Sequence, residues 1–139
     1  MSIKDKIKII PRKKITDERG WFLKVIDGTE ENLPNYTGEI YITSANKNEI
    51  RGNHYHIEAT EWFTLIEGKS TLFLEDINTK EKMKIKLDAD NPITIVIPPL
   101  IAHAFVNFEE KPFILIAYTN VLYDPKDTIR YEVYKKYEE

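Results

Sequence analysis

Two of the three histidines in this chain lie two positions apart, in the stretch RGNHYHIEATEWFTLIEGK from Arg51 to Lys69. In an extended strand, side chains two residues apart point to the same face, so His54 and His56 can converge on one point. Glu61 follows across a short turn, and His103 lies just after a separate proline-marked turn. Three imidazoles and one carboxylate suit a borderline divalent metal such as zinc, iron, manganese, nickel or copper. The spacing alone therefore predicts either a metal site or a polar pocket.

The composition places limits on the rest of the molecule. A chain of 139 residues is the size of one domain, and 31% charged residues with a net charge of -3 is ordinary. That balance argues against a nucleic-acid binder, which usually carries a basic face. The absence of cysteine excludes disulfides, thiolate metal sites and cysteine nucleophiles. Without an apolar signal core or an apolar run of membrane length, we expect a cytoplasmic protein with no membrane partner.

Short segments rich in β-branched and aromatic residues recur along the chain, and turn-forming stretches separate them. Strands are predicted at Gly20–Ile26, Gly38–Ala45, Arg51–His56, Glu61–Gly68, Ser70–Asp76, Met83–Leu87, Ile93–Ile97 and Phe113–Thr119. The lysine-rich beginning of the chain reads as a solvated edge strand, and the tail KDTIRYEVYKKYEE as either a terminal helix or one more strand. Many short antiparallel strands in one domain favour an all-β sandwich or jelly-roll barrel.

The stretch from His54 to Gly68 reads H-x-H, four residues, Glu, six residues, Gly, and it resembles the first motif of the cupin superfamily. The second cupin motif is similar to PPLIAHAFVN, although Leu100 stands where a glycine is usual. The resemblance implies an all-β, cupin-type antiparallel jelly-roll barrel that forms one domain over residues 1–139. It also implies one divalent metal, with four ligands: His54, His56, Glu61 and His103.

A narrower resemblance covers most of the chain. ITDERGWFLKV, IRGNHYH, IPPLIAHAFVN and LYDPKDTIRY occur in an order similar to that of dTDP-4-dehydrorhamnose 3,5-epimerases and the shorter dTDP-4-keto-6-deoxyglucose 3,4-ketoisomerases. RGNHYH also resembles the zinc-binding cupin domain of capsular-polysaccharide reductases, which makes zinc the favoured metal. This resemblance implies an isomerase or epimerase of a nucleotide-linked 4-keto-6-deoxy sugar, preferably dTDP-linked, in surface polysaccharide biosynthesis. It further implies a homodimer, in which a strand such as Lys6–Ile10 is exchanged.

Such a reaction removes a proton next to a ketone and returns it elsewhere, so it needs a base, an acid and a group that stabilises the enolate. His54 or His56 is the expected base, because neutral imidazole titrates near neutral pH. Tyrosines are the expected acids, with Tyr41 and Tyr118 foremost. The substrate-binding residues are expected to be Arg19, Arg51, Asn53 and Tyr123, since arginine binds phosphate oxygens in pairs.

The roles of the histidines leave the function open at this stage. The 3,5-epimerases have a lysine soon after the first histidine of the motif, but no lysine lies between His56 and Gly68. The same two imidazoles serve poorly as metal ligands and free bases at once. A metal-dependent cupin oxygenase and a non-catalytic, sugar-binding cupin therefore remain as alternatives to the isomerase.

Overall fold

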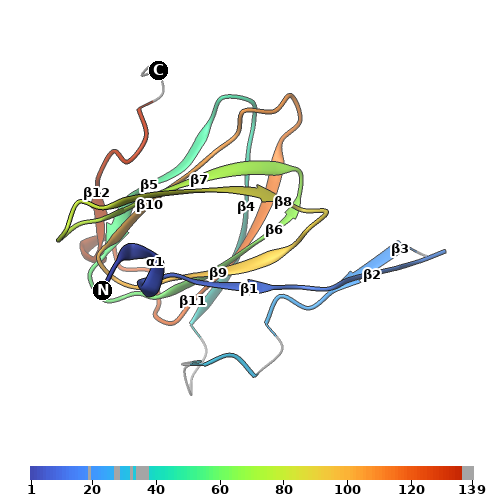
Figure 1. The fold of residues 1–139 in the computed structure, drawn as a ribbon, viewed down its shortest axis with the longest axis horizontal. Coiled ribbons are helices and arrows are strands. Elements are labelled where there is room, and N and C mark those ends of the chain that lie inside the picture. Colours follow the sequence, from blue (N-terminus) through green and yellow to red (C-terminus); the bar gives the residue numbers. More distant parts are fainter. Residues whose placement is uncertain (19, 27–28, 32, 34–37, 136–139) are drawn as a thin grey trace.

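The structure is a computed structural model that describes residues 1–18, 20–26, 29–31, 33 and 38–135. Most of these residues belong to antiparallel strands that form two five-stranded sheets and one separate hairpin (Figure 1). The strands are β1 (Lys8–Pro11), β2 (Lys14–Asp17), β3 (Gly20–Leu23), β4 (Glu39–Ala45), β5 (Ile50–His56), β6 (Glu61–Glu67), β7 (Lys69–Asp76), β8 (Lys82–Asp88), β9 (Ile93–Ile97), β10 (Ile101–Val106), β11 (Phe113–Thr119) and β12 (Thr128–Arg130). The prediction of an all-β antiparallel fold is confirmed.

The strand order shows that distant parts of the chain pair side by side. One sheet has the order β1-β9-β6-β11-β4, and the other has the order β12-β5-β10-β7-β8. Within the part of the chain that the structure describes, strands β2 and β3 pair only with each other, and their hairpin extends away from the two sheets (Figure 1). The candidate ligands named in the sequence analysis therefore come from both sheets. His54, His56 and His103 lie in β5 and β10 of one sheet, and Glu61 lies in β6 of the other.

The two ends of the chain differ in part from the prediction. A four-residue helix, α1 (Ile3–Lys6), precedes the expected edge strand, which is β1. In the tail, a 3-10 helix (Pro125–Asp127) leads into the short strand β12, so of the two alternatives the strand is the one that the described part of this stretch adopts. β12 forms because residues 128–130 continue the sheet beyond β5 and satisfy its edge hydrogen bonds.

Apolar side chains from the two sheets face each other and form one core. The most deeply buried of them include Leu72, Leu74, Ile95, Phe105 and Phe113, each at most 1% exposed. Their removal from water is the main source of stability for a cysteine-free chain of this size. In β8 the lysines are exposed and alternate with residues of the other face, of which Leu87 is buried. Among the described residues, no helix has the length and apolar character needed to cross a membrane.

Candidate active site

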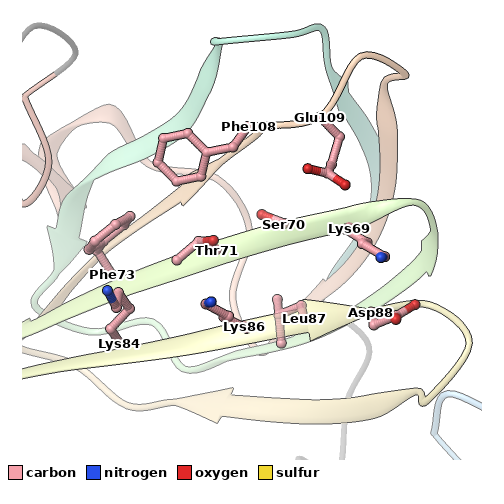
Figure 2. A pocket seen from close by; sticks show the side chains of 10 residues that line it. All are labelled: Lys69, Ser70, Thr71, Phe73, Lys84, Lys86, Leu87, Asp88, Phe108 and Glu109. Atoms are coloured by element: carbon pink, nitrogen blue, oxygen red, sulfur yellow. The ribbon is translucent and has the colours of Figure 1, made fainter.

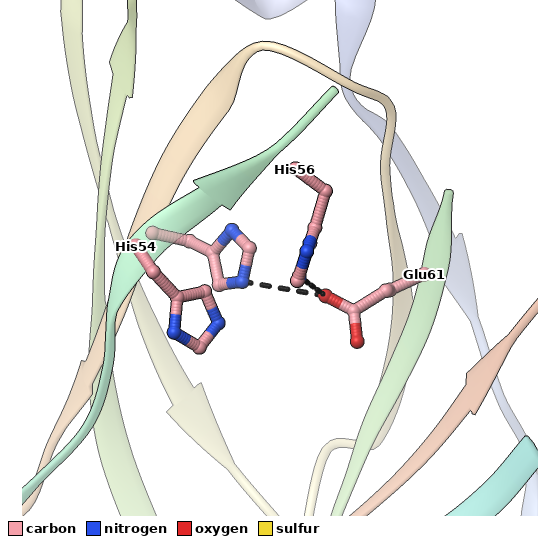
Figure 3. Close-up of side chains that lie close together, drawn as sticks. His54, His56 and Glu61 are labelled. Atoms are coloured by element: carbon pink, nitrogen blue, oxygen red, sulfur yellow. Dashed lines mark ion pairs between the residues drawn. The ribbon is translucent and has the colours of Figure 1, made fainter. Parts of the chain in front are cut away.

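Three strands bring the predicted ligands together inside the barrel. His54 and His56 come from β5, Glu61 begins β6, and His103 lies in the middle of β10, directly opposite His54. One potential ligand atom from each residue lies within 4.8 Å of the others. The His56 Nε2 atom is 2.9 Å from Glu61 Oε1 (Figure 3). The His103 Nε2 atom is 3.4 Å from the same oxygen. The four side chains that the sequence analysis named as possible ligands therefore lie close together.

The hydrogen bonds of the cluster leave its inner atoms unsatisfied. His56 Nδ1 lies 3.2 Å from the carbonyl oxygen of Asp127, and His103 Nδ1 lies 3.1 Å from that of Ile101. These contacts assign the hydrogen to Nδ1 and turn each Nε2 lone pair inward. The His56 and His103 Nε2 atoms and Glu61 Oε1 are buried, and none has a partner with hydrogen-bond geometry.

Unsatisfied buried polar atoms are costly, and here three of them converge on one point. A metal ion with bonds of about 2.1 Å to nitrogen and oxygen would satisfy all three. Two imidazoles and a carboxylate with an adjacent third imidazole also form a donor set that zinc and iron accept. The residues present therefore fit a divalent metal, and the fit rests on His56, Glu61 and His103, with His54 beside them.

Charge distribution around the cluster favours a cation. Burial alone would raise the pKa of Glu61, but contacts from His103 and His56 outweigh burial and hold that pKa well below its ordinary value. Burial, and after it the neighbouring His103 and His56, together lower the pKa of His54 to about 4, against a smaller opposing effect of Glu61. Burial would also lower the pKa of His56, yet the Glu61 carboxylate and the Asp127 carbonyl raise it overall. At neutral pH, Glu61 is therefore ionised and His54 is neutral.

Tyr41 is attached to the cluster from the side. Its hydroxyl group donates a hydrogen bond of 3.0 Å to Glu61 Oε2, the carboxylate oxygen that does not face the histidines. Burial and the negative charge of Glu61 raise the pKa of Tyr41 far above its ordinary value. Tyr41 therefore stays protonated, and it can give a proton but cannot act as a base at neutral pH.

Two cavities reach the cluster, and both are lined by Tyr41 and His54. One cavity, of about 280 Å³, opens past Leu122 and Tyr123 and has acidic side chains at its rim. The other, of about 230 Å³, includes Arg51 and is otherwise lined mainly by apolar and uncharged groups. A negatively charged substrate group is better matched by the cavity that contains Arg51.

A bulge in β5 brings Arg51 to this cavity. Ala104 pairs with Gly52 and His103 pairs with His54, so Asn53 has no opposite residue on β10. Gly52 and Asn53 have φ values of 110° and 60°, in the left-handed region. The extra residue changes the alternation, so Arg51 faces the same cavity as His54 rather than the opposite side. The Arg51 Nε group donates a 2.6 Å hydrogen bond to the carbonyl of Ser44.

Other predicted site residues are placed differently. Asn53 is buried, but its side chain bonds the backbone of Val133 and Tyr134, so it anchors the tail and is not in the site. Tyr118 packs on Trp62 on the outer face of its sheet, with ring centroids 5.3 Å apart, because it alternates with the inward-facing Ala117. The structure therefore places the side chains of both residues away from the histidine–glutamate cluster.

Tyr123 lies at the mouth of the acidic cavity and is 67% exposed. Its backbone N–H group donates a hydrogen bond to Glu39, which fixes the start of this loop. Arg19 lies outside the described residues. Of the three expected substrate-binding residues that the structure describes, Arg51 and Tyr123 line a cavity at the cluster.

A larger groove lies elsewhere, on the outer face of β7 and β8 (Figure 2). It has a volume of about 540 Å³, with Phe73 and Phe108 on one side and Lys84 and Lys86 on the other. The lysines are exposed, and none of the groove's side chains is a buried polar group without a partner. The convergent chemistry is therefore in the barrel and not in the larger groove.

Asp127 is the neighbour of the cluster that the sequence reasoning missed. It is buried, and it lies next to His56 although 71 positions separate them. The motif LYDPKDTIRY contains it, but the pattern gave no sign that this aspartate reaches β5. Only the pairing of β12 with β5 brings it there.

Comparison with known proteins now places the chain. The family model described as polysaccharide biosynthesis C-terminal domain matches residues 15–131. The chain belongs to this family. The chain is also similar to the spore coat polysaccharide biosynthesis protein SpsL of Bacillus subtilis (strain 168). The two are 27% identical over 126 residues, which cover 87% of this chain and 83% of SpsL. The expected connection with polysaccharide biosynthesis proteins is thus confirmed.

Solved structures share the fold of this polysaccharide biosynthesis C-terminal domain. A dTDP sugar isomerase from Desulfovibrio desulfuricans G20 superposes with a TM-score of 0.81 at 19% identity, over 89% of this chain and 82% of that chain. A mutant of the 3,4-ketoisomerase QdtA from Thermoanaerobacterium thermosaccharolyticum, in complex with TDP-4-keto-6-deoxyglucose, gives 0.74 at 24% identity, over 90% and 87%. The capsular polysaccharide assembling protein CapF from Staphylococcus aureus gives 0.65 at 23% identity, over 88% of this chain and 34% of CapF.

Proposed function

We propose that this protein is an isomerase or epimerase that acts on a nucleotide-linked 4-keto-6-deoxy sugar, preferably dTDP-linked, in surface polysaccharide biosynthesis. The observation that carries the proposal is the cluster of three histidines and a glutamate between two cavities of the barrel. The proposal is supported by the similar fold of a dTDP sugar isomerase and of a 3,4-ketoisomerase bound to TDP-4-keto-6-deoxyglucose. Membership in a polysaccharide biosynthesis family supports the pathway.

In this proposal His54 is the base that takes the proton next to the ketone. It lies beside the cluster, and its pKa of about 4 keeps it neutral and able to accept a proton at neutral pH. The His54 side chain is half-buried and lines both cavities, whereas His56 lines only one of them, so the His54 ring can meet a substrate in either cavity. Tyr41 is the acid, since it is protonated and lines both cavities with His54.

Arg51 binds the negatively charged nucleotide portion in this scheme. Its Nε group is occupied by the Ser44 carbonyl, which holds the planar guanidinium at the edge of the cavity. The remaining N–H groups of a guanidinium can bind two phosphate oxygens at once. The sugar would then occupy the inner end of the same cavity, against His54 and Tyr41.

We further propose that His56, Glu61 and His103 hold one divalent metal, with zinc favoured and iron, manganese or nickel as alternatives. Bound there, the metal would supply positive charge to the substrate carbonyl and the enolate oxygen. A catalytic zinc site has three protein ligands and one open position. The inward atoms of His56, Glu61 and His103 would be the three ligands, and His54 lies beside them. This division of labour lets His54 serve as a base while its neighbours are ligands.

A metal-dependent oxygenase is the second candidate, because the same donor set accepts redox-active iron. Incubation of the purified protein with dTDP-4-keto-6-deoxyglucose in D2O separates the two functions. The isomerase or epimerase should place deuterium on a carbon next to the ketone, visible by mass spectrometry and proton NMR. Oxygen consumption without deuterium incorporation would favour the oxygenase. If the protein shows neither activity but binds the sugar nucleotide saturably, it is a binding protein and not an enzyme for this substrate.

The matched controls for this assay are two tyrosine variants. Tyr41→Phe removes the hydroxyl group that contacts Glu61, and Tyr118→Phe removes one on the outer face of the same sheet. We expect deuterium incorporation to fall about 100-fold or more in Tyr41→Phe, the usual effect of losing a general acid. Tyr118→Phe should retain wild-type incorporation. Equal activity of both variants would remove Tyr41 from the mechanism.

We also propose a homodimer formed through sheet contacts. On the outer face of β4 and β11, Ile40 and Ile42 are 62% and 65% exposed, and they pair with Tyr118 and Ile116. Adjacent exposed apolar residues on an edge strand favour association with a second sheet. β1 pairs with β9 of its own chain here, so exchange of Lys6–Ile10 between subunits stays a prediction.

A further inference from the structure

The loop that separates two of the proposed ligands is held by a single carboxylate. Residues 57–60 join His56, at the end of β5, to Glu61, at the start of β6. The Asp127 Oδ1 atom accepts hydrogen bonds of 2.8 Å from the backbone N–H groups of Ile57 and Glu58. Its Oδ2 atom accepts one of 3.1 Å from Ala59. Three consecutive N–H groups are therefore bound by one side chain.

The same residue also orients an imidazole. The Asp127 carbonyl oxygen lies 3.2 Å from His56 Nδ1, and the next residue, Thr128, pairs with His56 across the β12–β5 ladder. A carbonyl at this position accepts the Nδ1 hydrogen, so the Nε2 lone pair points at Glu61 and His103. Asp127 thus controls the rotation of His56 with its backbone and the path from His56 to Glu61 with its side chain.

Strand pairing alone does not determine this path. β5 and β6 belong to different sheets, so no ladder hydrogen bonds connect His56 to Glu61 directly. Their relative position depends on the loop between them, and charge-assisted bonds to a buried carboxylate are among the stronger restraints on a loop. Asp127 is only 8% exposed, which protects these bonds from competition with water.

We infer that Asp127 is a positioning residue for the proposed metal and proton-transfer site. It acts through His56 and the loop before Glu61, and it couples the site to the segment that ends in β12. The inference rests on the proposed function for the purpose of the site. Its structural content, the orientation of His56 and the restraint on residues 57–59, is independent of whether a metal binds.

Two isosteric substitutions in the full-length protein test the inference. Asp127→Asn keeps the size of the side chain but presents an NH2 group where one oxygen accepted a backbone N–H. The matched control is Asp76→Asn, because Asp76 is also buried, and its side chain accepts hydrogen bonds from the backbone of Asn78 and Thr79 and from Lys6, none of which belongs to the cluster. Zinc affinity is measured by competition with a chromophoric chelator, and thermal unfolding is recorded for each protein.

We expect Asp127→Asn to bind zinc about 10- to 100-fold more weakly than the wild type, the usual effect of losing an outer contact of a ligand. Asp76→Asn should keep wild-type zinc affinity even where it loses as much thermal stability. Wild-type zinc affinity in Asp127→Asn, or an equal loss in Asp76→Asn, would overturn the inference.

A second measurement on the metal-free proteins separates this inference from the proposed function. NMR hydrogen exchange should show at least about tenfold faster exchange at residues 57–59 in Asp127→Asn, because an opened loop exposes its N–H groups. Nitrogen shifts should show His56 losing its preference for the Nδ1–H tautomer. If the wild type does not bind zinc, the metal assignment fails, and the inference is judged on these signals. Unchanged exchange and an unchanged tautomer would overturn it in that case.

Discussion

The Nε2 atom of His56 lies 2.9 Å from Oε1 of Glu61, yet the two atoms do not form a hydrogen bond of good geometry. His103 Nε2 approaches the same oxygen to 3.4 Å and is equally without a partner. Three buried polar atoms are therefore arranged around a common point instead of satisfying one another. This arrangement is what a metal site requires of the protein before the ion binds.

Glutamine substitutions should separate the ligands from the base. His103→Gln removes an inward, fully buried nitrogen, so bound metal per chain should fall to near zero. His54→Gln removes the imidazole proposed as the base, so the protein should retain metal but lose deuterium incorporation about 100-fold or more. Metal analysis of the dialysed variants, with circular dichroism to confirm folding, checks both results. Loss of metal in His54→Gln would make His54 a ligand and leave the base unassigned.

The stability of the metal-free protein should be greatest near pH 6.5. The pKa of His54 is lowered to about 4, so folding keeps it neutral, and its contribution is lost as pH falls from 6.5 towards 4. The pKa of His56 is raised above 6.5, so its contribution is complete below 6.5 and is lost as pH rises through the raised value. The pKa of Glu61 is lowered, so its contribution is present above about 4.5 and is lost only in more acidic solution.

Thermal unfolding of the metal-free protein between pH 4 and pH 8 measures this dependence. His54 is partly open to solvent, so we expect a decrease of about 1–2 kcal/mol from pH 6.5 to pH 4 after allowance for screening. His54→Gln should flatten the acidic side of the curve and leave the alkaline side unchanged. An acidic decrease of the same size in His54→Gln would assign it to other groups.

Gly52→Ala should distort the site through the β5 bulge. Gly52 has a φ of 110°, and an added Cβ atom would lie 2.6 Å from the carbonyl oxygen of His103. We expect a loss of at least about 1 kcal/mol in unfolding free energy, with weaker metal binding. Gly68→Ala is the matched control, because its φ is 85° and its contacts lie in a hairpin at Phe113. Gly68→Ala should lose stability but keep its metal affinity. If both variants lost metal affinity to the same extent, the β5 bulge would have no specific role in the site.

Leu100 should tolerate glycine better than valine. Leu100 occupies the position where the cupin motif usually has glycine, and its φ is 68°, in the left-handed region. Leu100→Gly relieves about 1–2 kcal/mol of backbone strain, because glycine adopts positive φ freely, but it also removes the packing of a partly exposed side chain. We therefore expect the free energy of unfolding to change by less than about 1 kcal/mol. A β-branched valine fits this conformation poorly and should destabilise by more than 1 kcal/mol. Chemical unfolding in urea compares the two, and a larger loss in Leu100→Gly would contradict the account.

The proposed dimer should depend on the outer face of β4. Ile42→Lys places a charge in the patch formed with Ile40, Ile116 and Tyr118, and we expect sedimentation to shift from dimer to monomer. Phe108→Lys is the control. It changes another exposed apolar residue, which lines the groove on the outer face of β7 and β8, and it should leave the dimer intact. A wild-type protein that stays monomeric at high concentration would refute the homodimer.

Much of this molecule is readable from local sequence patterns. Alternation in the stretch Met83–Leu87 and the β-branched segments predicted strands, because strand periodicity is a property of neighbouring residues. The His-x-His spacing and Glu61 predicted three members of the cluster for the same reason. His103 was a candidate because of its residue type, and only the resemblance to the second cupin motif supported placing it with the other three, since no local spacing connects it to them.

Tertiary structure decided the rest. The bulge at Gly52 and Asn53 reverses the alternation that would have directed Arg51 away from His54. Asp127 reaches His56 only because β12 pairs with β5, across 71 positions of sequence. Tyr118 faces outward because β11 is placed with Ala117 against the core. Periodicity describes which residues share a face, whereas register, bulges and the pairing of distant strands decide which faces meet, and these depend on the energy of the whole fold.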